Sequence, residues 1–111
     1  MTDSNNAEVQ FIEDVQTATE YQLKHSPNVV TTETADGRLI SATIGLNDFT
    51  HPQTEEHLIE WMAILDGDTI LEKSYFTAGQ TPRIELTVSD TDAILVIQAY
   101  CNLHGVFGAY V

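Results

Sequence analysis

The chain has 111 residues, of which 42% are apolar, and its 17 acidic and 4 basic residues give a net charge of −13 at pH 7. That length is typical of a single domain. The negative charge disfavours nucleic acids and anionic membrane surfaces, because binding to either relies on Lys and Arg. No apolar run approaches the roughly 18 residues of a membrane-spanning helix. The polar start MTDSNNAEVQ lacks the basic and apolar parts of a secretory signal, so we expect a cytoplasmic protein.

The first 23 residues form an acidic and polar segment that precedes the predicted domain, residues 24–111. A weak amphipathic pattern in Phe11, Ile12 and Val15 indicates at most one short helix there. We therefore expect the N-terminal segment to be irregular.

Beyond Pro27 the sequence changes to short β-branched and apolar runs separated by turn-forming residues. Ala35-Asp36-Gly37 and Asp66-Gly67-Asp68 are typical of the tight turns between neighbouring strands. Seven short strands with almost no helix predict an all-β sandwich of antiparallel strands. The predicted strands are residues 29–34, 38–45, 57–65, 69–76, 83–89, 93–100 and 106–111.

All four histidines and the single cysteine are candidate metal ligands. His51 and His57 lie in the motif HPQTEEH, and Cys101 and His104 lie in CNLHG, both where loops meet predicted strands. His25 lies in LKHSP, just ahead of the first strand. A rigid sheet can present loop side chains in these places to a common site. A single cysteine also excludes an intrachain disulfide and any centre built from four cysteines.

Several metals remain open on the residue types alone. Imidazoles suit iron, zinc, copper and nickel, while a thiolate disfavours magnesium, calcium and manganese. Structural zinc takes four ligands, and blue copper takes two histidines and one cysteine, so both leave candidates unused. Four imidazoles and one thiolate fit a square pyramid with an open sixth position, and a thiolate pushes electron density onto iron. Taken singly, each residue is equally typical of a surface histidine or a small buried cysteine.

The same motifs resemble those of the superoxide reductases, the family of neelaredoxin and of the iron-binding domain of desulfoferrodoxin. HPQTEEHLIEWMAIL is similar to the family's HP-x-T-x-E-H-x-I-x-W segment, and CNLHG is similar to its CN-x-HG motif near the C-terminus. KHSP resembles the Lys-His-x-Pro of the family's N-terminal loop. The resemblance covers residues 24–107, in the family's order.

The resemblance implies an immunoglobulin-like β-sandwich that holds one mononuclear non-haem iron, cycling between Fe²⁺ and Fe³⁺. It implies that Lys24 attracts superoxide and helps to deliver water or a proton. It also implies that the backbone amides of Leu103 and His104 hydrogen-bond the cysteine sulfur and tune its donor strength. The metal ligands that the resemblance implies are His25, His51, His57 and His104 in equatorial positions and Cys101 in the axial one.

The implied activity is that of a superoxide reductase, in which superoxide, one electron and two protons give hydrogen peroxide without release of dioxygen. With a single cysteine, the electron must come from a separate donor such as rubredoxin. Relatives form dimers or tetramers, which implies a homo-oligomer. The chain departs from the family at Leu23, where a glutamate is usual, and at Val106 and Phe107, near which a tryptophan is common.

Two readings compete with a single-domain superoxide reductase. The first is a non-catalytic β-sandwich in which zinc or iron only stabilises the fold. The second is an acidic interaction domain whose histidines and cysteine are incidental. A visible charge-transfer band on oxidation separates the enzyme from both, because zinc or an empty site stays colourless.

Overall fold

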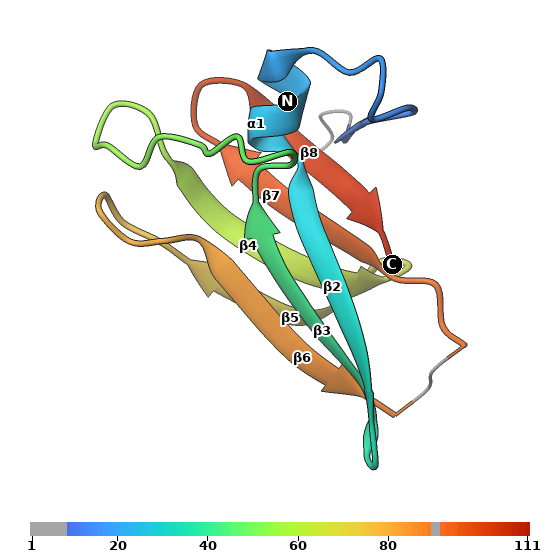
Figure 1. Ribbon diagram of the computed structural model, residues 1–111. Helices are drawn as coiled ribbons and strands as arrows, with labels where there is room; N and C mark the ends of the chain where they lie inside the picture. The colour runs from blue at the N-terminus through green and yellow to red at the C-terminus, as the bar shows by residue number, and fades with distance from the viewer. Residues whose placement is uncertain (1–8, 90–91) are drawn as a thin grey trace.

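The computed structural model describes residues 9–89 and 92–111, which form two packed β-sheets and one short helix (Figure 1). The predicted all-β sandwich is therefore confirmed. The five-stranded sheet contains, in spatial order, β1 (Gln10–Phe11), β8 (Gly105–Tyr110), β7 (Val96–Cys101), β4 (Ile59–Asp66) and β5 (Thr69–Tyr75). The three-stranded sheet contains β2 (Pro27–Thr34), β3 (Gly37–Ile44) and β6 (Arg83–Val88).

The seven predicted strands overlap β2 to β8, and the N-terminal segment accounts for the differences. Phe11 lies in β1, which pairs in parallel with β8, whereas every other strand pair is antiparallel. The Phe11 ring stacks on Tyr110 at 4.9 Å between centroids. The expectation of a short helix around Phe11 was wrong, because this apolar side chain packs on the sheet.

The helix lies further along the chain, as α1 (Glu20–His25). Thr19 caps its N-terminus, and Thr19 and Gln22 exchange the reciprocal hydrogen bonds of a capping box. The helix ends because Ser26 is extended, as expected for a residue that precedes Pro27. His25 is therefore the last helical residue, placed just where the chain enters β2.

The hydrophobic core between the sheets reaches one end of the sandwich. Figure 1 shows α1, the loop between β3 and β4 and the turn between β7 and β8 gathered at that end. Cys101 is the last residue of β7, rather than the first residue after it as predicted, and it belongs to the core. In the described part of the chain, no helix is long and apolar enough to cross a membrane. The buried core cluster consists of Ile40, Ala42, Ile59, Met62, Ile64, Ile84, Leu95, Ile97, Ala99 and Cys101.

Candidate metal centre

His25 is buried at the end of α1, and the fold fixes the orientation of its ring. Its Nδ1 lies 2.6 Å from the carbonyl oxygen of Tyr21, one helical turn earlier, and its ring stacks on Phe107 at 4.6 Å. A carbonyl oxygen can only accept a hydrogen bond, so Nδ1 carries the proton and Nε2 keeps a free lone pair. That Nε2 is buried and has no hydrogen-bond partner among the described residues.

His51 has the same arrangement in the loop between β3 and β4. Its Nδ1 lies 2.6 Å from the carbonyl oxygen of Pro52, which again leaves the lone pair on Nε2. This buried Nε2 also has no partner in the described structure. A backbone acceptor at one ring nitrogen is the usual support of a histidine that binds a metal through the other.

His57 stands at the end of the same loop, just before β4. Its backbone N–H donates to the Thr54 hydroxyl at 3.2 Å, and the Thr54 N–H donates back to the His57 carbonyl at 3.0 Å. These bonds fix the turn that carries the imidazole. Its Nε2 is the third buried ring nitrogen without a partner in the described residues.

Cys101 brings a fully buried thiol to the same place. Burial raises the pKa of this thiol, and hydrogen bonds from the backbone amides of Leu103 and His104 to the sulfur oppose that rise. The two amide contacts match those implied by the family resemblance. They favour the thiolate, which is the form that binds metals.

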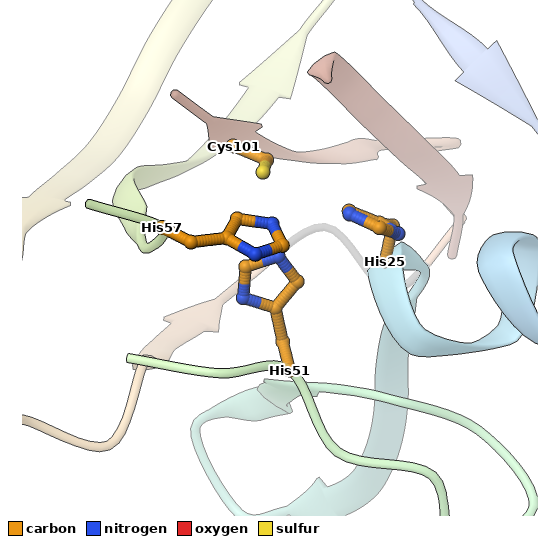
Figure 2. A group of neighbouring side chains, drawn as sticks. All are labelled: His25, His51, His57 and Cys101. Carbon is orange, nitrogen blue, oxygen red and sulfur yellow. The ribbon is translucent and has the colours of Figure 1, made fainter. Parts of the chain in front are cut away.

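These four side chains converge on one point. The candidate ligand atoms of His25, His51, His57 and Cys101 all lie within 4.8 Å of one another, and Figure 2 shows the three rings and the sulfur facing a common space. Three unpaired ring nitrogens buried together are costly unless something binds them. The donor set therefore fits a metal ion that prefers imidazole and thiolate, such as iron or zinc.

His104, the fifth predicted ligand, is exposed and lies beside the other four without joining the group of mutually close ligand atoms. Its ring is in edge contact with the rings of His25 and His57, at 5.0 and 5.2 Å between centroids. Its place in the ligand set remains a prediction.

Burial lowers the pKa of the imidazoles of His25, which is buried, and of His51 and His57, which are half-buried. It is the largest cause for each, and it lowers the pKa of His51 from 6.5 to about 4. The neighbouring histidines lower the pKa values further, and Lys24 contributes to the lowering at His25 and His57. Neutral imidazoles are therefore favoured at pH 7, and only the neutral form has a lone pair for a metal.

Lys24, predicted to act on superoxide, lies on α1 next to His25. Its Nζ is 2.9 Å from a carboxylate oxygen of Glu20, and 38% of its side chain is exposed. Leu23, which replaces the family's usual glutamate, has only 6% of its surface exposed. An acidic side chain at position 23 would therefore be largely buried.

Tyr21, Asn102 and Gln53 support the candidate histidines and were not predicted from the sequence. Tyr21 precedes His25 by four residues, a helical spacing that would have signalled the contact had the helix been predicted. Asn102 and Gln53 bond the backbone around His57. The sequence signal that could have identified Asn102 and Gln53 is their position inside the motifs CNLHG and HPQTEEH.

Fold and site together define a β-sandwich protein with a buried centre of three histidines and one cysteine, and comparisons place it in a family. The profile of the family described as Desulfoferrodoxin matches residues 17–109. The desulfoferrodoxin of Clostridium acetobutylicum is 36% identical over 90 residues, a match that covers 79% of this chain and 62% of that protein. The desulfoferrodoxin homolog of Archaeoglobus fulgidus is 31% identical over 94 residues, covering 85% and 68%. The chain belongs to the desulfoferrodoxin family.

A solved structure supports the fold independently. The superoxide reductase from Nanoarchaeum equitans superposes with a TM-score of 0.73 at 18% identity, covering 94% of this chain and 98% of that one. At that identity the match shows a shared sandwich. The activity of this chain has to be argued from its site, because it spans less than two thirds of the Clostridium protein.

Proposed function

We propose that this protein is a superoxide reductase that holds one mononuclear non-haem iron. The observation that carries the proposal is the convergence of three unpartnered, buried imidazole nitrogens with a buried thiol whose sulfur accepts two backbone amides. His25, His51, His57 and Cys101 would hold the iron, and His104 is proposed as the fifth ligand from its adjacent ring. The iron, when bound, supplies the single electron that reduces superoxide.

The protein's own groups prepare the site for that chemistry. The carbonyl oxygens of Tyr21 and Pro52 hold two imidazoles in the tautomer that directs Nε2 inward. The amides of Leu103 and His104 draw charge from the sulfur and so limit its donation to the metal. These contacts join groups of the protein itself, so they can orient the ligands for a metal.

Lys24 is the proposed catalytic residue, because superoxide is an anion and the chain carries a charge of −13. All four basic residues lie in the described part of the chain and make contacts, Lys24 with Glu20 and the other three with groups outside the proposed site. Arg38 donates to a backbone carbonyl, Arg83 pairs with Glu85, and Lys73 lies over two aromatic rings. Lys24 alone adjoins a proposed ligand, where its positive charge attracts the substrate. Superoxide, one electron and two protons balance as hydrogen peroxide, and Lys24 or water bound to it supplies a proton.

The remaining proposals concern partners. The single cysteine leaves no second redox centre of the cysteine type, so a separate electron carrier of the rubredoxin kind reduces the metal. We also propose a homo-oligomer, dimer or tetramer, in the cytoplasm. Superoxide reaches the site from solvent, and neither nucleic acid nor membrane takes part.

A structural zinc site is the second candidate, and one observation favours it. The group of mutually close ligand atoms contains four residues, which is the coordination number of structural zinc. Metal analysis of protein purified without added zinc separates the candidates. Iron at one equivalent, with a visible thiolate-to-iron band that appears on oxidation, supports the reductase. Zinc at one equivalent and a colourless protein contradict it.

A further inference from the structure

Asn102 holds the backbone on both sides of His57. Its Oδ1 accepts a hydrogen bond from the N–H of Leu58 at 3.0 Å, and its Nδ2 donates to the carbonyl of Glu56 at 3.0 Å. His57 lies between those two residues, while Asn102 itself directly follows Cys101. One side chain therefore links the segments of two proposed ligands that are far apart in sequence.

Gln53 makes a second pair of bonds to the same stretch of chain. Its Nε2 donates to the carbonyl of Ile59 at 2.9 Å, and its Oε1 accepts from the N–H of Ile59 at 3.0 Å. Gln53 follows His51 by two residues, and Ile59 is the fully buried first residue of β4. The loop that carries His51 is thereby tied to the strand that follows His57.

We propose that Asn102 and Gln53 form an amide clamp, which sets the position of His57 relative to Cys101 and His51 before a metal binds. Asn102 is then a positioning residue, since its side chain bonds only to backbone groups. The clamp can position a ligand only if the proposed metal site exists, so this inference rests on the proposed function. The clamp itself rests on four hydrogen bonds within the protein, with both polar atoms of each side-chain amide in use.

An amide side chain suits this role better than a carboxylate of similar size. Asn102 must accept from one backbone group and donate to another, and a carboxylate cannot donate. Substitution with alanine removes both bonds, whereas substitution with aspartate keeps the bond from Leu58 and sets a carboxylate oxygen against the carbonyl oxygen of Glu56, which repels it. The backbone N–H of Asn102 donates to the carbonyl of Leu58 at 3.1 Å, and either substitution leaves that bond in place. The two variants therefore disturb the clamp in different ways on an otherwise retained loop.

Hydrogen exchange of the unmodified, metal-free protein gives the first test, because it needs no variant to fold. The amide of Leu58 should exchange nearly as slowly as that of Met62 in the middle of β4, since Asn102 holds it without metal. If the Leu58 amide exchanges as fast as the amide of a residue in an exposed loop, the proposal is wrong. In Asn102→Ala we expect about tenfold faster exchange at Leu58, the effect of losing one net hydrogen bond.

Cobalt(II) titration followed by the thiolate-to-cobalt absorption band gives the second test. Asn102→Ala should bind cobalt(II) about tenfold or more weakly, the usual cost of losing a group that orients a ligand, and its band should shift. Asn102→Asp should also bind cobalt(II) more weakly than the parent, because its carboxylate cannot donate to Glu56. Gln98→Ala is the matched control, because Gln98 lies on β7 three residues before Cys101 and has no side-chain hydrogen bond within the described residues.

The two measurements separate the clamp from the proposed function. Cobalt(II) binding by Asn102→Ala with the parent's affinity and spectrum overturns the clamp as a positioning device. If the unmodified protein binds no cobalt(II), the proposed metal function fails, and the exchange of the Leu58 amide still decides whether the clamp exists.

Discussion

The two ends of the sandwich are ordered by different kinds of contact. At the end far from the histidines, β2 turns into β3 and β4 into β5 through short reversals that use positive φ angles at Gly37 (140°) and Gly67 (58°). The opposite end carries the candidate metal ligands and is called the metal end. There, the irregular loop that ends at Leu58 depends on the side chains of Gln53 and Asn102. The metal end also uses positive φ angles, at Gly45 and Asp48 for example, but it depends in addition on hydrogen bonds between distant segments.

The two ends should therefore respond differently to substitution. A substitution in a far turn should change the free energy of unfolding and leave the site intact. A substitution at the metal end should change ligand geometry even where stability is little affected.

Cys101→Ser should abolish the visible thiolate-to-iron band and most superoxide reductase activity. A hydroxyl oxygen is a poorer electron donor than sulfur, and it cannot replace the charge transfer of a thiolate. Absorption spectra and iron content of the oxidised protein measure the effect, and we expect part of the iron to remain on the imidazoles. A band that survives the substitution would show that the cysteine does not bind the metal.

Lys24→Ala should slow the bimolecular reaction with superoxide by about tenfold or more, the range of electrostatic steering. Lys73→Ala is the matched control, because it removes the same charge from a lysine that lies 4.4 Å from the centre of the Trp61 ring. Pulse radiolysis across a salt series measures both rates. Added salt should slow the parent, because screening weakens the local attraction by Lys24. Equal rates for the two variants would mean that only the net charge matters.

Acidification should destabilise the metal-free protein between pH 6.5 and about pH 4. The pKa of His51 falls from 6.5 in the unfolded chain to about 4 in the folded protein, so in that window the unfolded state binds more protons. Stability then falls as the pH falls. Urea unfolding at a series of pH values measures the trend, and His51→Gln should flatten it. An unchanged slope in His51→Gln would argue that this imidazole is not buried in its neutral form.

Gly67→Ala should lower the free energy of unfolding by about 1 kcal/mol, the cost of a side chain at positive φ. An added Cβ meets nothing within 4 Å at this position, so only backbone conformation is affected. Metal affinity and spectrum should equal those of the parent. A changed spectrum would break the separation between the two ends.

The parts of the fold set by local patterns were predictable from sequence. Alternating apolar residues and glycine turns identify the main strands, because both act over a few residues. The two-residue β1 was missed, since its parallel pairing with β8 joins residues almost 100 positions apart, Gln10 with Phe107. The helix was misplaced, although Thr19 and Gln22 already carried the spacing of a capping box.

The residues of the candidate metal centre were predictable from sequence, as were the backbone amides of Leu103 and His104 beside the sulfur, whereas the side chains that hold the ligand loops were not. Five ligands were predicted, and the structure brings candidate ligand atoms of four of them, His25, His51, His57 and Cys101, within 4.8 Å of one another, while the place of His104 stays a prediction. The partners of Asn102 lie 44 and 46 residues away in sequence, so no local pattern indicates them. Only the packing of β4 against β7 brings these groups together.

The product ratio of a single turnover tests the proposed superoxide reductase activity most directly. The iron-loaded, reduced protein is mixed with a substoichiometric amount of superoxide, and hydrogen peroxide and dioxygen are both quantified. A superoxide reductase should give one hydrogen peroxide for each superoxide and no dioxygen. The ferric thiolate band should grow in proportion to the superoxide consumed. Half as much peroxide with matching dioxygen and no change of iron oxidation state, or no reaction at all, would contradict the proposed activity.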